Sequence, residues 1–375
     1  MNPQVQYGAD VIMRANYALE HGTEALSMCV RKAVNEMLGS LAEDAGIRRE
    51  DVFQVCVVGN TCMHHLFLGI SPASLVHAPY TPAVSERLVL NAGDYGLAVQ
   101  ERAELIMLSD IAGYVGADTC GCLLAIRQDQ QEEISLMIDI GTNGEMVLGN
   151  RERMVTCSTA AGPAFEGAKI ECGMRGAAGA VDHVKYEDGK WNYTTVGNKP
   201  AVGLCGSGLI DLVAGLLEAG MLDENGVLRS GQEKQGVFIL VPPERGGNER
   251  GVYLTQKDLG EVQLAKAAIA AGIQMLMERL GITEDDICSV YIAGAFGNYM
   301  DPVSAGKIGL LPATLVKKVK PVGNAAGEGA KIALVNEKEM LEMDELVRKI
   351  EFVELAASAD FQDHFIDELG FETGE

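Results

Sequence analysis

The chain lacks an excess of positive charge. It has 30 lysine and arginine residues against 53 aspartate and glutamate residues, which gives a formal net charge of −23 at pH 7. Nucleic-acid-binding proteins normally present a basic face to the phosphate backbone, so this balance argues against DNA or RNA as a partner. It does not exclude small phosphate compounds, because backbone N–H groups bind phosphate whatever the sign of the surrounding charge. Nucleotides therefore remain candidate ligands.

Long apolar runs are also lacking. No stretch reaches the roughly 18 apolar residues that a membrane span needs, and the first residues contain no basic segment followed by an apolar run. We therefore expect no membrane segment and a cytoplasmic location. The cysteines are odd in number, 9, and most have apolar or Gly/Ala-rich neighbours, which favours reduced thiols over a disulfide framework.

Recognisable metal-binding patterns are scarce. The 6 histidines form no H-E-x-x-H pattern, and we expect His64 and His65 to start a helix with one ring inward and the other outward. Cys120 and Cys122 form a close pair, but no second pair follows at the spacing of a zinc ribbon or a ferredoxin. The pair therefore has two interpretations, a metal or cluster site and small residues on a packed helix, and the second is favoured.

Apolar periodicity predicts an α/β alternation with a lobe boundary in the solvated stretch near residue 130. Glycine-rich turns after apolar strands recur four times along the chain, which indicates one ligand contacted from several sides. The predicted elements are helices over 8–46 and 108–128, strand-turn-helix over 52–70, paired strands over 134–148, a helix opened by Gly-Ser-Gly over 202–222, a helix over 254–281 with a capping box at Thr255 and Asp258, a strand and glycine turn over 288–302, a glycine-initiated helix from 323, a short strand at "EFVEL" and a terminal helix. The N–H groups that open the 202–222 helix suit an anion, and we include Gly206 among the candidate binding residues.

The stretch "MIDIGTNGEMVL", residues 137–148, carries the most specific chemistry. A phosphate site needs converging N–H donors, backbone without interfering Cβ atoms, and an oxygen ligand for the accompanying Mg²⁺. Asp139 offers the ligand, Gly141 and Gly144 permit close approach, and the side chains of Thr142 and Asn143 are donors. The stretch is neither a Walker loop nor a dinucleotide fingerprint, because it lacks Gly-Lys-Ser/Thr and turns into a strand. An ordinary β-hairpin is the alternative for this stretch alone.

The order of "DIGTNGE", "AAGPAFEGA", "YIAGAFGNYMDP" and "GNAAGEGA" resembles the acetate and sugar kinase, heat-shock chaperone and actin (ASKHA) superfamily. The stretches "NPQVQYGADVIMRANYA", "VVGNTCMHHLFLG", "YVGAD", "CSTAAGPAFEGA", "LTQKDLGEVQLAKAAI" and "AGAFGNYMDPVSAGKIGLLP" are more closely similar to the ATPase part of the reductive activators of corrinoid-dependent enzymes. This resemblance extends from residue 2 to about residue 370. It implies a two-lobed α/β fold of ribonuclease-H-like lobes that binds ATP with Mg²⁺.

The resemblance also implies roles for individual residues. Asp139 would contact the metal, with Gly141, Thr142, Asn143 and Gly144 at the phosphates. The base and ribose would lie beside Gly294, Ala295, Phe296 and Gly297, and Gly162 would be a close-approach position. Asp118 in "YVGAD" and Glu145 would orient water or metal as catalytic residues; alternatively, either caps a helix or pairs with a lysine.

The chain departs from this family in its first residues. Such activators usually begin with a ferredoxin domain holding a two-iron two-sulfur cluster, followed by a first-lobe hairpin of the form Asp-Ile-Gly-Thr-Thr-Thr. The sequence "MNPQVQYGAD" resembles the stretch after that hairpin. We therefore expect a first lobe over 1–130, N-terminally truncated and without its phosphate hairpin, a second lobe over 131–322, and a helix-strand-helix segment over 323–375 packing back on the lobes. No iron-sulfur cluster is expected on this chain, and the electron donor would be another chain or a missing N-terminal ferredoxin domain.

The implied function is ATP-dependent reduction of the cobalt(II) corrinoid of a methyltransferase or corrinoid protein to cobalt(I). Two alternatives remain open. One is an activator of 2-hydroxyacyl-CoA dehydratases, or a kinase, on the same fold; such activators hold a cluster between subunits through cysteines, and Cys157 stands near the corresponding segment. The other is a non-catalytic docking module for a corrinoid protein. The sequence leaves the oligomeric state open, a homodimer included.

Overall fold

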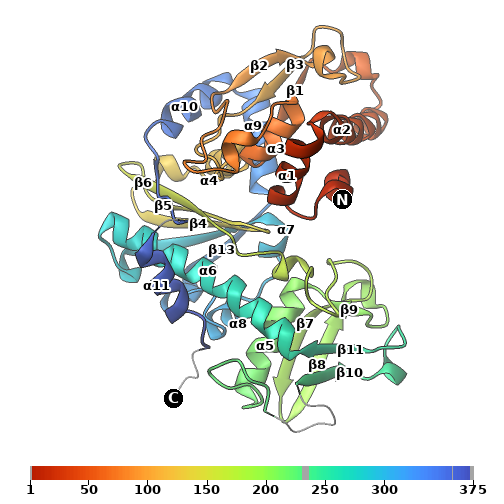
Figure 1. The fold of residues 1–375 in the computed structure, drawn as a ribbon, viewed down its shortest axis with the longest axis vertical. Helices are drawn as coiled ribbons and strands as arrows, with labels where there is room; N and C mark the ends of the chain where they lie inside the picture. Colours follow the sequence, from red (N-terminus) through yellow and green to blue (C-terminus); the bar gives the residue numbers. More distant parts are fainter. Residues whose placement is uncertain (1, 230–235, 357, 372–375) are drawn as a thin grey trace. The chain divides into compact units, whose positions relative to one another are not determined.

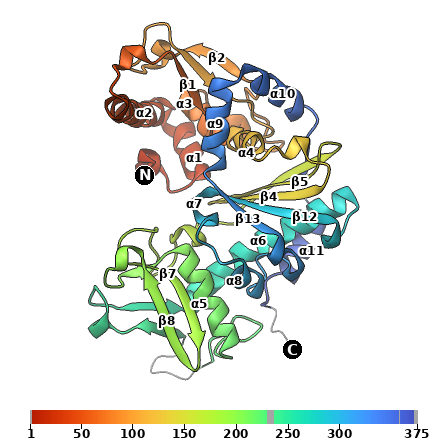
Figure 2. The same cartoon turned by 180° about the vertical axis from the view of Figure 1, so that it is seen from behind.

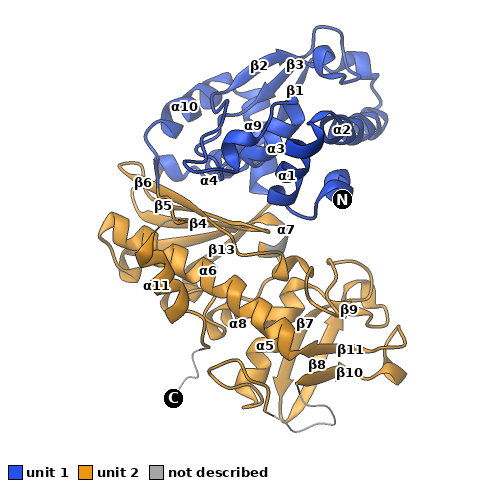
Figure 3. Cartoon of the chain, viewed as in Figure 1, with its two compact units in different colours: residues 1–130, 324–352 blue, residues 131–323, 353–375 orange. Residues whose placement is uncertain are grey.

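The chain forms two compact α/β units in this computed structural model. Unit 1 comprises residues 1–130 and 324–352, and unit 2 comprises residues 131–323 and 353–375 (Figure 3). The structure describes residues 2–229, 236–356 and 358–371, without the side chains of Ala295 and Phe296. The division into three domains that we expect from the sequence stays a prediction.

Unit 1 is built on a small sheet with the strand order β1-β3-β2. Strand β1 is parallel to β3, and β2 is antiparallel to it. Helices α2 and α3 pack against each other, as do α4 and α9 (Figures 1 and 2). The elements of unit 1 are α1 (Val11–His21), α2 (Glu24–Ala45), β1 (Gln54–Val57), α3 (Thr61–Leu68), β2 (Leu88–Asn91), β3 (Glu104–Met107), α4 (Ala117–Ile126), α9 (Ala325–Val335), α10 (Glu337–Val347) and β14 (Glu351–Phe352).

Two of the helices predicted in unit 1 are shorter than the sequence pattern indicates. The predicted helix over 8–46 is two helices, because Gly22 adopts φ +85°, outside the helical region, and ends α1. The predicted helix over 108–128 begins only at Ala117, where the side chain of Asp110 accepts a hydrogen bond from the Ala117 N–H group at 2.9 Å. Both predictions were wrong at the helix boundaries. The apolar and small residues of the sequence pattern continue past the points at which the backbone leaves the helical conformation.

Unit 2 contains a larger sheet in which β13, β12, β4, β5 and β6 are neighbours in that order. Strands β13, β12 and β4 are parallel, whereas β4, β5 and β6 form an antiparallel meander. A second sheet has the order β8-β7-β9, and β10 pairs with β11. The elements are β4 (Ile134–Ile140), β5 (Gly144–Gly149), β6 (Met154–Thr159), β7 (Ala180–Glu187), β8 (Lys190–Thr195), β9 (Gly203–Leu204), α5 (Gly206–Glu218), β10 (Val237–Val241), β11 (Val252–Thr255), α6 (Gln256–Leu280), β12 (Ile287–Ala293), α7 (Gly294–Gly297), α8 (Pro302–Lys307), β13 (Val319–Gly323) and α11 (Ala359–Asp367).

Helix α6 covers the meander. It packs on β5 and β6 and contacts α11 (Figure 1). The predicted capping box is confirmed: the Thr255 hydroxyl accepts from the Asp258 N–H group, and the Asp258 carboxylate accepts from the Thr255 N–H group. On the apolar face of α6, Val262, Ile269 and Ile273 are fully buried. This packing gives the β4–β5 hairpin a rigid support.

The topology places two glycine turns at one edge of the larger sheet. Strands β4 and β12 are adjacent and parallel, and Asp139 is in register with Ala293 at their carboxyl ends. The chain then turns at Gly141 after β4 and enters α7 at Gly294 after β12. Ligands of open α/β sheets bind outside the carboxyl ends of the strands. This edge is therefore where a site is expected.

Candidate functional site

A cavity of about 710 Å³ opens at this edge, entirely within unit 2. It is large enough for a nucleotide, since ligand pockets usually have volumes of about 300–1,000 Å³. Three glycine-bearing turns contribute to its walls, at Gly141, Gly206 and Gly294. The lining residues are Asp139, Ile140, Gly141, Phe165, Glu166, Met174, Arg175, Gly176, Asp182, Val196, Gly197, Cys205, Gly206, Ser207, Gly294 and Tyr299.

The β4–β5 hairpin brings Asp139 to the cavity. Asp139 is directly opposite Glu145 in the ladder, and Ile140 is opposite Gly144, so the turn consists of Gly141, Thr142 and Asn143. The Gly141 N–H group donates to the Asn143 carbonyl at 3.0 Å and closes the turn. Opposite residues share a face of an antiparallel ladder, yet Glu145 is not among the lining residues.

The Asp139 carboxyl is in an unfavourable environment for a charge. Burial raises its pKa to about 6. Within the described residues, no hydrogen bond or ion pair compensates it, and a methyl group placed on Gly294 would lie 2.8 Å from its Oδ1 atom. Gly294 also adopts φ +85°, a conformation that favours glycine, so glycine is the residue that suits this position beside the carboxylate. An uncompensated acid at a cavity wall is typical of a functional site.

The residues present are compatible with a Mg²⁺ ion. Asp139, Glu166 and Asp182 give the cavity three carboxylates, and oxygen is the ligand that Mg²⁺ prefers. No group of three or more His, Cys, Asp or Glu side chains among the described residues forms a ready-made metal site. Mg²⁺ is commonly held by one or two carboxylates together with substrate phosphates and water, so the arrangement suits an ion that arrives with a nucleotide.

The segment after β6 closes around the hairpin turn. The Gly162 N–H group donates to the Thr142 carbonyl at 2.8 Å. The Thr142 hydroxyl donates to Glu166 Oε1 at 2.7 Å. Gly162 has a φ of +77°, and a methyl group placed on it would meet no atom within 4 Å. The positive φ explains why glycine occupies this position, but Gly162 is not among the lining residues, and its close-approach role stays a prediction.

The first turn of α5 forms another wall. Cys205 is the N-cap residue, and Gly206 and Ser207 line the cavity. Gly208 fits against β7, because a methyl group there would overlap the Val181 carbonyl. The Ser207 hydroxyl donates to the carbonyl of Asp182 at 2.8 Å. The amino end of a 13-residue helix favours an anion in the cavity.

Among the residues whose side chains are described, Thr142, Asn143, Gly144 and Gly297 are not in the cavity lining. A methyl group on Gly144 would lie 2.8 Å from Thr159 Oγ1 and 3.2 Å from Ile269, and one on Gly297 would lie 2.6 Å from Ile292. These two glycines are therefore explained by packing. Ala295 and Phe296 belong to α7, but their side chains lie outside the described residues. The binding roles of these residues, and those of Thr142 and Asn143, stay predictions.

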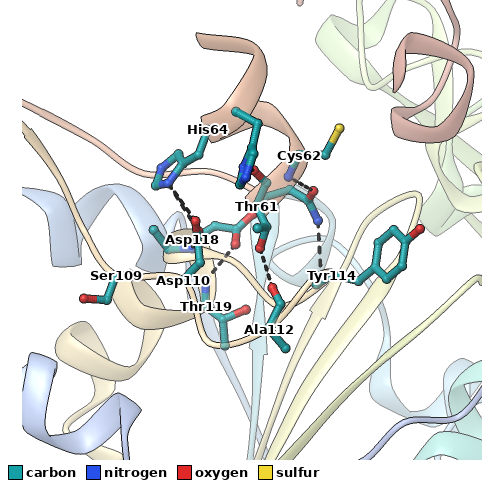
Figure 4. Close-up of polar contacts among 12 residues, drawn as sticks. Thr61, Cys62, His64, Ser109, Asp110, Ala112, Tyr114, Asp118 and Thr119 are labelled. Atoms are coloured by element: carbon teal, nitrogen blue, oxygen red, sulfur yellow. Dashed lines mark hydrogen bonds and ion pairs between the residues drawn. The ribbon is translucent and has the colours of Figure 1, made fainter. Parts of the chain in front are cut away.

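Asp118 belongs to unit 1, where it lies in the first turn of α4. Its Oδ1 atom accepts from the Thr119 N–H group at 2.9 Å (Figure 4). Nearby, the Asp110 carboxylate lies 3.2 Å from Nδ1 of His64. The prediction that one of His64 and His65 points outward was wrong, since the two are 4% and 1% exposed. His65 is inward because its ring bonds the Thr61 carbonyl and the Ala83 N–H group.

Among the polar residues of the cavity, sequence reasoning missed Glu166, Arg175, Asp182 and Ser207. Glu166 and Ser207 lie inside glycine-rich stretches that we single out, so their position offered a signal. The sequence positions of Arg175 and Asp182 offered no such signal, because Arg175 lies in a loop and Asp182 lies on β7.

The cysteines of the chain are mostly buried. Cys157 is fully buried on β6, and burial raises the pKa of its thiol. A ligand to a cluster shared between subunits must reach the surface as a thiolate. The buried position of Cys157 therefore argues against its role as a cluster ligand. The alternative of a 2-hydroxyacyl-CoA dehydratase activator depended on that residue. Cys120 and Cys122 are buried in α4, in agreement with the interpretation as small packed residues.

Comparisons with known proteins agree with this geometry. Residues 133–375 match the family model described as the C-terminal domain of RACo, the ASKHA domain, and residues 1–131 match the RACo middle region. Within the described residues, no helix is long and apolar enough to cross a membrane.

Three similar proteins are named for the activation or reduction of corrinoid proteins. The corrinoid activation enzyme RamQ of Eubacterium limosum is 35% identical over 384 residues, which cover 98% of this chain and 64% of RamQ. A reductase of the cobalt(II) methylated amine-specific corrinoid protein of Methanosarcina barkeri is 27% identical, with 98% of this chain and 71% of the reductase covered. The solved structure of a reductive activator for a corrinoid, iron-sulfur protein superposes with a TM-score of 0.90 at 37% identity, covering 99% of this chain and 61% of that chain. The chain thus spans under two thirds of RamQ and of the solved activator. The expected superfamily fold is confirmed.

Proposed function

We propose, because the chain belongs to the RACo family, that it binds MgATP in the unit 2 cavity and acts in the ATP-dependent reduction of a cobalt(II) corrinoid to cobalt(I). The observation that carries this proposal is the uncompensated Asp139 carboxylate at the end of β4, beside two glycine turns. The relatives named above act on corrinoid proteins, and this supports a corrinoid protein as the partner.

The need for ATP follows from the energetics of the reaction. Reducing cobalt(II) to cobalt(I) lies below the reach of ordinary cellular electron donors, so the transfer must be coupled to an energy source. A nucleotide supplies this by binding one conformation more tightly than another, and it shifts the equilibrium by that difference. The electron donor would be a ferredoxin-type domain or a separate chain.

The residues of the cavity have separate roles in this proposal. A bound Mg²⁺ would neutralise phosphate charge, and Asp139 would hold it directly or through its water shell. The first turn of α5, at Gly206 and Ser207, would place N–H groups toward phosphate. Gly294 would let the nucleotide approach the end of β12, and Arg175 gives the cavity wall a cation for an anionic ligand.

Calorimetric titration with MgATP tests this proposal. The unmutated chain should bind, and Asp139→Asn should weaken binding about tenfold or more, because a charge-assisted contact is lost. Asp285→Asn is a matched control, since Asp285 is exposed in the turn before β12, at the opposite end of that strand. Equal affinity of the Asp139→Asn variant and the unmutated chain would contradict the assignment. Corrinoid-protein binding that ignores MgATP would instead favour the docking-module alternative.

A further inference from the structure

The hydroxyl of Thr142 already has a partner in this structure. It donates to Glu166 Oε1 at 2.7 Å, a short hydrogen bond typical of a charged acceptor. A threonine hydroxyl has one proton to donate. It therefore cannot donate to a phosphate while it donates to Glu166.

The backbone around Glu166 is fixed to the hairpin. Ala164 and Phe165, the residues before it, are 2% and 3% exposed. The Gly162 N–H group bonds the Thr142 carbonyl at 2.8 Å. Glu166 itself is only half-buried and lines the cavity. The side chain can therefore change its partner while the neighbouring backbone stays in place.

The Glu166 carboxylate also lies at the glycine of the turn. A methyl group placed on Gly141 would be 3.8 Å from Glu166 Oε1. Gly141 lines the same cavity, so Glu166 is at the surface where a ligand would meet the turn. A phosphate at this turn would meet a like charge and a competitor for the same hydroxyl proton.

We propose that Glu166 holds the Thr142 hydroxyl when no phosphate is present, and that a nucleotide phosphate displaces it. Glu166 is then a positioning residue that makes binding depend on the phosphates of the nucleotide. The displaced carboxylate belongs to the segment between Gly162 and Gly167, which adopt φ values of +77° and +79°. The exchange would report phosphate occupancy to that segment. This inference rests on the proposed function, because it takes MgATP as the ligand of the cavity.

The inference is tested by whether the affinity for MgATP rises or falls when Glu166 is replaced. Glu166→Ala removes the competitor and its charge, and Glu166→Gln removes the charge but keeps an acceptor of similar shape. Both variants should bind MgATP about three- to tenfold more tightly, because a half-exposed carboxylate contributes a modest repulsion. Thr142→Val should bind MgATP about tenfold more weakly. Adenosine, which has no phosphate, should bind all of these variants with unchanged affinity.

Glu133→Ala is the matched control, because it removes the same charge at an exposed residue just before β4, away from the carboxyl end of that strand. Calorimetry of all variants in one buffer gives the comparison. Weaker MgATP binding by Glu166→Ala would overturn the inference and make Glu166 a support of the turn or a cation contact. Unchanged MgATP binding would also overturn it. Absence of MgATP binding by the unmutated chain would instead contradict the proposed function, so the two failures are distinguishable.

Discussion

Two glycine turns of this chain look alike in sequence but serve different ends. In unit 1, Gly116 precedes α4, and a methyl group on it would lie 2.6 Å from the Thr61 amide nitrogen and 2.7 Å from the Asn60 Cα atom. In unit 2, a methyl group on Gly141 would meet nothing closer than 3.6 Å. The first glycine lets backbone approach backbone, whereas the second leaves open space at a cavity wall. Glycine density alone therefore does not distinguish a packing contact from a ligand site.

The acidic residues near the two turns differ in the same way. Asp110 is 4% exposed in unit 1, and it accepts from the Ala117 N–H group and contacts His64. Asp139 in unit 2 has its pKa raised to about 6 by burial. A buried carboxylate with hydrogen-bond partners stabilises the fold, whereas a buried charged carboxylate without partners destabilises it. The comparison shows that Asp110 has partners within unit 1, whereas Asp139 faces a cavity in unit 2, as the proposed ligand role requires.

The largest expected effect is on the free energy of unfolding in the Gly116→Ala variant. The new methyl group would overlap the backbone of Asn60 and Thr61, which cannot move as a side chain can. We expect a loss of about 3 kcal/mol or more, measured by urea denaturation, because overpacking of a close backbone contact forces the chain apart. A loss under about 0.5 kcal/mol would remove the distinction between the two turns.

Replacing Asp139 or Asp110 by asparagine should have a smaller effect on the free energy of unfolding. The effect should have opposite signs in the two units. Because the folded-state pKa of Asp139 is about 6, above its ordinary value of 3.8, stability falls as pH rises from about 4 to about 6. Asp139→Asn should therefore raise the free energy of unfolding by about 2 kcal/mol above pH 6, with no gain below pH 4. Asp110→Asn should lower it by about 1–2 kcal/mol at pH 7, since a buried partner is lost.

Denaturation of both variants at pH 4, 5, 6 and 7 provides the measurement. The unmutated chain is the reference at each pH. Destabilisation by Asp139→Asn at pH 7 would mean that its carboxylate is compensated and would weaken the argument for a functional site.

Much of the fold follows from local pattern. The strand-turn-helix over 52–70, the strand pair over 134–148, the opening of α5 and the capping box of α6 are confirmed, because each depends on neighbouring residues. The break at Gly22 and the late start of α4 were missed, because a glycine conformation and the distant Asp110 carboxylate decide them. Asp139, Gly141, Gly206 and Gly294, which the sequence singles out, all line the cavity, while their binding roles stay predictions. Arg175 and Asp182 required the tertiary structure.

The smallest change in stability is expected from the Gly141→Ala variant. Gly141 is not among the positive-φ residues, and the surrounding space accommodates a methyl group, so the free energy of unfolding should change by less than about 0.5 kcal/mol. The same methyl group would project at the cavity wall where phosphate must approach, and MgATP should bind about tenfold more weakly. Urea denaturation and calorimetry on one preparation measure both quantities. Lost stability with unchanged affinity would make Gly141 a packing glycine like Gly116, and the two turns would then differ only in their neighbours.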